Sequence, residues 1–209
     1  MNFISNLIKR LKNFFYYERV VLYGYDLSVH HEFEFATDMK LSVSTLKDAE
    51  QLYHDELNTD LTSIEWDIWK EKISKGLWKG FICKDGDAIV AQAFYSIEDI
   101  FFGGTKGVVL NLPPQCSYGS KLYTRPDYRG RKLGQAITSF RLNYAKKDGI
   151  KKYFTIIFSD NKVSRHNEEK IGGYLVGSVM FLSCRFFNKV FLTPGILRAG
   201  LRIKRISDI

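Results

Sequence analysis

The chain has 209 residues, of which 45% are hydrophobic, 15% aromatic and 26% charged. This length and composition fit one globular domain, or one domain with a short appendage, and they make intrinsic disorder a poor explanation. The net charge of +8 is unevenly distributed. Residues 1–104 carry 11 Lys and Arg against 17 Asp and Glu, whereas residues 105–209 carry 20 against 6. The basic half predicts an anionic ligand, either a nucleic acid or a phosphorylated small molecule.

Missing motifs disfavour several classes of function. The three cysteines are far apart in the sequence, without a C-x-x-C pair, which predicts reduced thiols in a cytoplasmic protein. The sequence contains no G-x-G-x-x-G, Walker P-loop, H-E-x-x-H or G-x-S-x-G motif. The four histidines show no ligand-like spacing, so we expect no metal. No nucleic-acid-binding motif accompanies the basic half, so we expect no nucleic-acid partner.

The first 27 residues are interpreted as an N-terminal extension of a domain that spans residues 28–209. Apolar residues between Phe3 and Phe15 recur with a helical period and basic residues flank them, which predicts an amphipathic helix. This helix either packs on the domain or makes a peripheral contact through residues 1–19, at the inner face of a membrane. A strand is expected next, over residues 20–27.

The middle of the chain alternates between short strands and amphipathic helices. The expected elements are strand 40–43, helix 45–56, helix 63–75, strand 78–84 and strand 88–97. Trp66 and Trp69 of the second helix either pack in the core or line an acceptor cleft. Residues 103–117 are expected to form a loop, because glycines and a Pro-Pro pair dominate them.

The second half continues this alternation. The expected elements are strand 118–124, helix 130–147, strand 153–158, helix 164–171, strand 174–183, strand 186–192 and a helical tail over 196–205. Helix 130–147 has the clearest pattern, with Leu133, Ile137, Phe140 and Tyr144 on one face. Together these elements predict an α/β (α+β) domain built around one central sheet.

One segment has a chemical signature, where strand 118–124 passes through a Pro-Asp turn into a helix that starts at Gly130. The first backbone amides of a helix lack intrahelical partners, and the helix dipole adds positive potential there. A pyrophosphate cradle is therefore expected from the amides of Arg131, Lys132, Leu133, Gly134 and Gln135. The side chains of Arg129, Arg131 and Lys132 add positive charge. The alternative is an ordinary basic helix start on the surface.

This segment resembles the acetyl-CoA-binding motif of the GNAT superfamily of N-acetyltransferases. The family pattern is Arg or Gln, two residues, Gly, one residue, then Gly or Ala, and residues 129–134 fit it except that Lys132 stands where the family prefers Gly. A side chain there demands a compatible backbone angle. Residues 161–174 resemble the later family motif, with Asn161 after a strand, Ser164 opening a short helix, and Gly173 in the usual Phe position, which Tyr174 would fill.

The resemblance implies a GNAT-like fold with a mixed, mostly antiparallel central sheet flanked by helices. It also implies transfer of an acetyl group from acetyl-CoA to a primary amine, by direct attack in a ternary complex. The acceptor would be a small molecule such as an amino sugar, or a peptide, and the oligomeric state stays open, a homodimer included. The residues implied in binding acetyl-CoA are Thr124, Arg129, Gly130, Arg131, Lys132, Leu133, Gly134, Gln135, Asn161 and Ser164.

The catalytic residues are less clearly marked. The attacking amine must lose a proton, and Glu98, which follows strand 88–97 together with Asp99, is expected to act as the base through water. The alternative is that these are solvated loop carboxylates. Many family members place a Tyr in the later helix, where it protonates the leaving thiolate, but Glu168 occupies that position here. The acid is then Glu168, one of Tyr123 and Tyr174, or solvent.

Two other classes of function remain open from the sequence. One is a GNAT-like module that holds CoA but has lost turnover, because Lys132 and Glu168 depart from the family pattern. The other is a basic protein that binds a membrane surface or nucleic acid.

Overall fold

The computed structural model describes residues 15–29, 32–35, 37–54, 63–101, 108–184 and 187–205. The amphipathic helix expected before residue 15 lies outside these ranges, and so does most of the membrane contact predicted from it. The side chains of Trp66 and Trp69 also lie outside the described part of the chain, so their predicted role stays a prediction.

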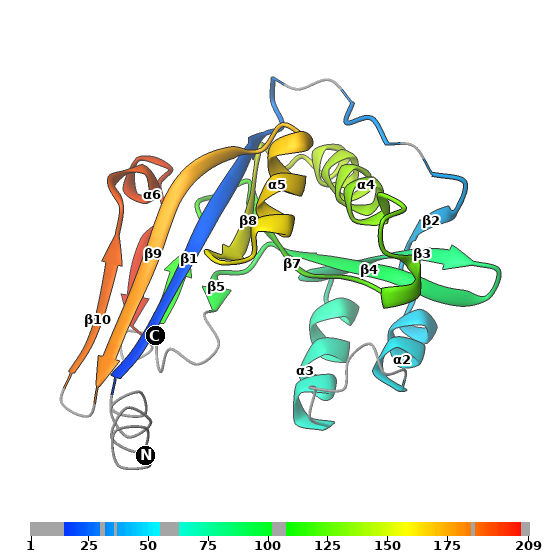
Figure 1. Ribbon diagram of the computed structural model, residues 1–209. Helices are drawn as coiled ribbons and strands as arrows, with labels where there is room; N and C mark the ends of the chain where they lie inside the picture. Colours follow the sequence, from blue (N-terminus) through cyan, green and yellow to red (C-terminus); the bar gives the residue numbers. More distant parts are fainter. Residues whose placement is uncertain are drawn as a thin grey trace, which may run out of the picture.

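The central sheet has eight strands in the order β10-β9-β1-β8-β7-β4-β3-β2 (Figure 1). Their bounds are β1 Phe15–Asp26, β2 Lys40–Val43, β3 Trp78–Asp85, β4 Ala88–Ser96, β7 Cys116–Thr124, β8 Lys152–Phe158, β9 Tyr174–Cys184 and β10 Phe187–Leu192. All neighbours pair antiparallel except β7 and β8, which are parallel. The predicted mixed, mostly antiparallel sheet is confirmed.

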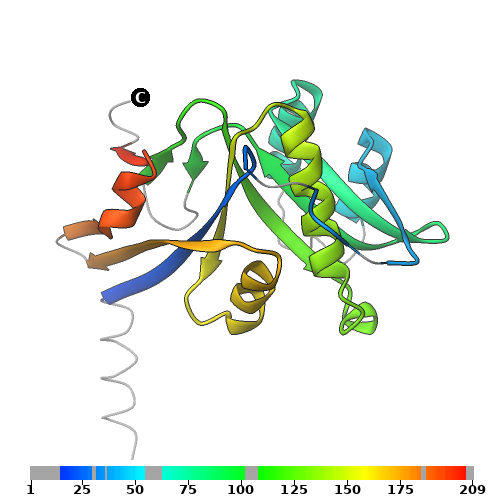
Figure 2. The ribbon, with the colours of Figure 1, turned by 90° about the horizontal axis from the view of Figure 1, so that it is seen from above.

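Helices cover both faces of this sheet. The bounds of the larger helices are α2 Leu46–His54, α3 Ser63–Ser74, α4 Leu133–Lys147 and α5 Lys162–Lys170. In Figure 1, α4 lies on one face of β3, β4 and β7, and α2 and α3 lie on the opposite face; Figure 2 shows α5 beside α4. Leu133 and Ile137 of α4 are fully buried as predicted, whereas Phe140 packs edge-on against Phe81 at the border of the core.

A second, three-stranded sheet has the order β11-β6-β5. Its strands are β5 Ile100–Phe101, β6 Val108–Asn111 and β11 Arg202–Arg205, and the short helix α6 spans Pro194–Arg198. The prediction of loop over 103–117 is wrong at β6, and the prediction of one helix over 196–205 is wrong because Gly200, at a φ of +87°, turns the chain between α6 and β11. Both errors arise because β6 and β11 pair with each other across about ninety residues of chain.

Strand β1 lies inside the central sheet, between β8 and β9. It begins five residues before the predicted strand and pairs antiparallel with both neighbours along most of its length. One of its faces contributes Val20 and Leu22 to a core shared with the small sheet and α6. The described part of the proposed N-terminal extension is therefore built into the same sheet as the rest of the chain.

Strands β7 and β8 separate part-way along their length. They pair from Cys116 opposite Lys152 to Gly119 opposite Thr155, and beyond this point β7 follows β4 while β8 follows β1. The register between β4 and β7 shifts between Ser120 and Tyr123, and Lys121 there has a φ of +53°. A bulge of this kind bends a strand and increases its twist. The bulge thus opens a gap in the sheet between the second halves of β7 and β8.

We predict that Gly119→Ala destabilises the protein by about 1–3 kcal/mol, as overpacking does. A Cβ at Gly119 would lie 2.8 Å from Cζ of Arg141 and closer still to the Tyr153 hydroxyl. The matched control is Gly134→Ala, because the nearest atom to a Cβ there is 4.0 Å away and alanine favours a helix by up to about 1 kcal/mol. Thermal melts of both variants test this, and an unchanged melting temperature for Gly119→Ala would contradict it.

Candidate functional site

The segment that joins β7 to α4 is a tight turn with two left-handed residues. A single 3-10 turn over Pro126–Tyr128 is followed by Gly130 at a φ of +81° and Lys132 at a φ of +60°. Helix α4 therefore begins at Leu133, three residues later than predicted, with Lys132 at its N-cap. Lys132 adopts the backbone angle that the family's Gly would take freely.

The helix start leaves several backbone amides available. The amide of Gln135 donates to the Lys132 carbonyl at 3.0 Å, so the prediction that it is free is wrong. The amides from Gly130 to Gly134 have no hydrogen-bond acceptor among the residues that the structure describes. Because the positive end of the helix dipole lies at the same place, this turn can hold a diphosphate.

A cavity of about 630 Å³ lies in front of these amides. Tyr123 and every residue predicted to bind acetyl-CoA line it, except Arg131. The exception has a physical cause, since the guanidinium of Arg131 lies over the Tyr128 ring, 4.8 Å from its centroid. In Figure 2, β7 and β8 run apart, and the turn between β7 and α4 lies on the side where the two strands are separated.

Helix α5 forms the far wall of this cavity. It begins at Lys162, two residues earlier than predicted, because Asn161 caps it: the Asn161 Oδ1 accepts a hydrogen bond from the Ser164 amide at 3.1 Å. Gln135 Nε2 donates a hydrogen bond to Asn167 Oδ1 at 3.0 Å, which connects α4 to α5 at the wall of this cavity.

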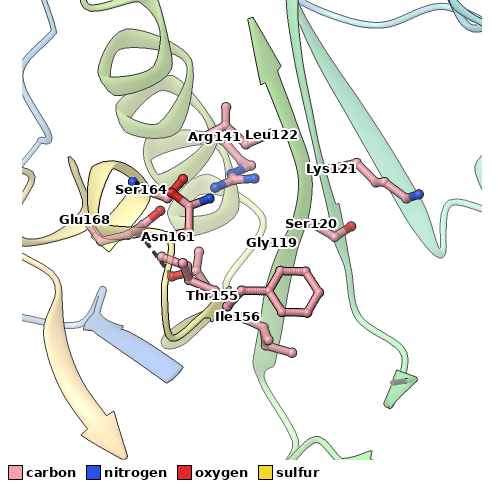
Figure 3. Close-up of a pocket in the computed structure, with 12 residues that line it drawn as sticks. Gly119, Ser120, Lys121, Leu122, Arg141, Thr155, Ile156, Asn161, Ser164 and Glu168 are labelled. Atoms are coloured by element: carbon pink, nitrogen blue, oxygen red, sulfur yellow. Dashed lines mark hydrogen bonds between the residues drawn. The ribbon is translucent and has the colours of Figure 1, made fainter. Parts of the chain in front are cut away.

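A second cavity, of about 180 Å³, lies in the gap itself. It shares Leu122, Asn161 and Ser164 with the first, so the two spaces adjoin. Figure 3 shows Arg141, Asn161, Ser164 and Glu168 gathered between the two helices, beside β7 at Gly119 and Ser120. The two cavities together lead from the amide cradle to the closed end of the gap.

Glu168 is a buried carboxylate at this closed end. It is 3% exposed, and its Oε2 accepts hydrogen bonds from the Tyr25 hydroxyl at 2.5 Å and from Thr155 Oγ1 at 3.1 Å. Its Oε1 has no partner among the described residues. Burial, and then the charge of Glu168, raise the pKa of Tyr25 well above its ordinary value, so the Tyr25 hydroxyl stays protonated and donates.

Arg141 is a buried cation that lines the same cavity. It is 1% exposed, its Nη1 donates to the Phe94 carbonyl at 3.1 Å, and its guanidinium lies over the Tyr153 ring at 5.2 Å. Within the described ranges no carboxylate forms an ion pair with it. The closed end of the gap therefore has a positive group on the α4 side and a negative group on the α5 side.

The other predicted catalytic residues lie elsewhere. Tyr123 lines the larger cavity and not the smaller one, and Tyr174 lines neither. The Glu98 Oε2 accepts hydrogen bonds from Lys72 Nζ and from Trp78 Nε1, both at 2.6 Å, and Glu98 is outside both cavity walls. Only Glu168 of the predicted catalytic residues reaches the gap.

The described part of the chain shows neither a cluster of metal-ligand side chains nor a membrane-spanning helix. No three His, Cys, Asp or Glu side chains there lie together as metal ligands would. No helix there combines the length and the apolar character needed to span a bilayer.

Comparison with known proteins gives the family. Residues 44–185 match the Acetyltransferase (GNAT) family, and this range is more than half of the chain. The chain belongs to the GNAT family. The match includes β7, α4, β8 and α5, which build the candidate site described above, but not β1. No curated protein matches the sequence.

Solved GNAT structures share the fold at low sequence identity. A putative GNAT-family acetyltransferase from Novosphingobium aromaticivorans aligns with a TM-score of 0.57 at 12% identity, covering 79% of this chain and 63% of that one. A GCN5-related N-acetyltransferase from Kribbella flavida aligns with 0.55 at 13%, covering 96% and 67%. AAC(6')-Iy, in complex with the bisubstrate analogue CoA-S-monomethyl-acetylneamine, aligns with 0.53 at 13%, covering 65% and 90%. The chain thus spans less than two thirds of the Novosphingobium protein's length.

Sequence reasoning missed three residues of this candidate site, namely Tyr25, Arg141 and Thr155. A signal existed for Arg141, because it stands four residues after Ile137 and four before Ala145, on the buried stripe of α4. A lone arginine on an apolar stripe indicates a specific role. No local pattern marks Tyr25, which reaches the site only because β1 inserts between β8 and β9.

We predict that Lys132→Gly leaves stability within about 0.5 kcal/mol of wild type, because glycine accepts the left-handed angle that strains lysine. The same variant should bind acetyl-CoA a few-fold more weakly, most clearly at low salt, because it loses a positive charge at the cradle. The control is His166→Gly in the middle of α5, where glycine costs up to about 1 kcal/mol. Thermal melts measure the effect on stability, and titration calorimetry measures the effect on binding. A large loss of stability in Lys132→Gly would contradict the left-handed backbone angle at Lys132.

Proposed function

We propose that this protein transfers an acetyl group from acetyl-CoA to a primary amine of a small molecule or a peptide. The observation that carries the proposal is the junction of two features: unpartnered amides at the start of α4, and a gap between β7 and β8 that leads away from them. A diphosphate at the amides would direct an extended arm into the gap. The family membership supports acyl transfer as the reaction.

The dimensions of the site support a CoA thioester as the donor. From Thr124 to Gly119, β7 runs about 16 Å along the gap at roughly 3.3 Å per residue. An extended pantetheine arm fits this length, so its thioester would lie near the closed end. The amides of residues 130–134 would hold the diphosphate, and the side chains of Arg129 and Lys132 would add charge.

The chemistry then requires one net proton transfer. The amine nitrogen attacks the thioester carbonyl carbon, a C–N bond forms and the C–S bond breaks. The amine loses one proton and the leaving thiolate gains one. We assign Glu168 to this proton transfer, because it lines the cavity where the sulfur would be and both hydrogen bonds that its carboxylate accepts from described residues go to Oε2. Arg141, on the other side, would stabilise negative charge on the thioester oxygen.

Glu98, which the sequence predicts as the base, is the alternative to Glu168 for removing the proton from the amine. It lies near Tyr118, whose pKa burial and then the Glu98 charge raise to about 12. Tyr118 is one residue before the point where β7 and β8 part, so a water chain would have to connect Glu98 to the gap. The Glu98 Oε2 already accepts hydrogen bonds from Lys72 Nζ and Trp78 Nε1, so this oxygen has less capacity left for a bridging water.

The acceptor is proposed from charge alone. The acidic first half of the chain, which includes α2 and α3, suits a cationic amine. A panel of amines for assays should include aminoglycosides such as neamine, because AAC(6')-Iy forms a complex with an acetylneamine analogue. Peptides with free N-termini complete the panel.

We predict that Gly134→Asp weakens acetyl-CoA binding at least tenfold, because it places a negative charge among the amides that would hold the diphosphate. Gly134→Asn is the matched control, with the same shape and no charge. Calorimetry at low and high salt separates the two variants. Equal dissociation constants for Asp and Asn would count against a diphosphate at this turn.

We predict that Glu168→Gln lowers kcat by 10²-fold or more while the KM for acetyl-CoA changes little, as removal of a proton-transfer group does. Glu169→Gln, on the next residue of α5 but exposed, should act as wild type. Thiol release over the amine panel provides the measurement, with Glu98→Gln in parallel. If the wild-type protein binds acetyl-CoA but no amine elicits thiol release, the inactive CoA-binding module is the better description.

A further inference from the structure

Two tyrosines of β1 reach the same helix in the same way. Tyr23 and Tyr25 are two residues apart, so their side chains lie on one face of the strand. The Tyr23 hydroxyl donates to Glu169 Oε1 and the Tyr25 hydroxyl donates to Glu168 Oε2, each at 2.5 Å. These bonds connect β1 to consecutive residues of α5.

The two bonds differ in what their carboxylates face. Glu169 is exposed, lies outside both cavities and has Arg165 nearby as a further partner of Tyr23. Glu168 is buried and lines the cavity in the gap. Both tyrosines hold β1 against α5, but only Tyr25 contacts the carboxylate to which the proton transfer is assigned, that of Glu168.

The packing around Tyr25 is close. A Cβ at Gly173 would lie 2.8 Å from both Cζ and Oη of Tyr25, so Gly173 makes room for this ring at the end of α5. The expectation that Tyr174 fills the space left by Gly173 is wrong, because Tyr25 of β1 lies against it. A ring from outside the matched range thus brings a hydroxyl to Glu168.

We infer that Tyr25 is a positioning residue for acyl transfer: its hydrogen bond holds Oε2 of Glu168 and leaves Oε1 turned toward the cavity. The inference rests on the proposed function, in which Glu168 moves the proton. It extends the active site to β1, a strand that the family match does not include.

Other charged and titratable groups face Glu168 from the elements around it. Arg141 of α4 and Tyr153 of β8 lie within electrostatic range, and Lys121 of β7 lines the same cavity. Thr155 of β8 adds a second, neutral hydrogen bond. Tyr25→Phe leaves all of these groups in place and removes only the hydroxyl, whose short bond is to the carboxylate and which also lies 3.2 Å from the Glu168 backbone carbonyl oxygen.

The test compares Tyr25→Phe with Tyr23→Phe in the full-length protein. The Tyr25 bond stabilises the charged carboxylate, so its loss should move the limb of the kcat–pH profile that depends on Glu168 to higher pH. We expect kcat at neutral pH to change by up to about tenfold and the KM for acetyl-CoA to stay constant. Tyr23→Phe should leave the pH profile unchanged, although it removes an equally short bond. If both variants give the wild-type profile, or both shift it equally, the inference is overturned.

Two further measurements keep the outcome unambiguous. In a Glu168→Gln background, Tyr25→Phe should have no further effect on kcat, and an undiminished effect there would overturn the inference. If Tyr25→Phe does not fold, 3,5-difluorotyrosine at position 25 is the substitute, because it keeps the ring and makes the hydroxyl a stronger hydrogen-bond donor. The limb of the kcat–pH profile that depends on Glu168 should then move to lower pH. An unchanged profile would overturn the inference. If Glu168→Gln keeps full activity, the role assigned to Glu168 is wrong, and the role of Tyr25 is wrong with it. If Glu168→Gln is inactive but Tyr25→Phe has the pH profile of the wild-type protein, only the role of Tyr25 is overturned.

Discussion

The pairing of β7 with β8 ends at Gly119 and Thr155, and the site depends on that end point. Beyond that point each strand pairs only with its other neighbour, β7 with β4 and β8 with β1. The backbone groups that face the gap therefore have no strand opposite them to hydrogen-bond with. A sheet tolerates such an opening only where polar groups or a ligand supply partners. The bulge at Lys121 bends β7 and makes the opening part of the fold rather than a defect.

The gap has chemical meaning because of what lies at its two ends. The open end meets the start of α4, where backbone amides and the helix dipole present positive potential without a side chain. The closed end holds Arg141 and Glu168, two buried charges that do not pair with each other. Buried charges are costly unless the fold or a ligand stabilises them. The arrangement suits a donor that is anchored at one end and reacts at the other.

The sequence predicts the cradle well and the closed end poorly, for one reason. Gly130, Gly134 and the basic residues between them lie within one turn of chain, so a local motif describes them fully. The α5 position of Glu168 follows from counting along a helix that begins at Asn161. Tyr25 and Arg141 act through contacts across 143 and 47 residues of chain, to Glu168 and Phe94. The pairing of β6 with β11 is likewise non-local. Local signals predict a loop at β6, because of its neighbouring glycines, and a helix at β11, because of its basic residues.

Hydrogen–deuterium exchange with and without acetyl-CoA tests the central claim most directly, because it reports on the backbone amides themselves. If the amides at the start of α4 hold the diphosphate and the arm lies in the gap, acetyl-CoA should slow exchange at residues 130–134 and along 120–124 and 156–158. Coenzyme A without the acetyl group should protect the same amides. Unchanged exchange at residues 130–134 under saturating acetyl-CoA would contradict the account.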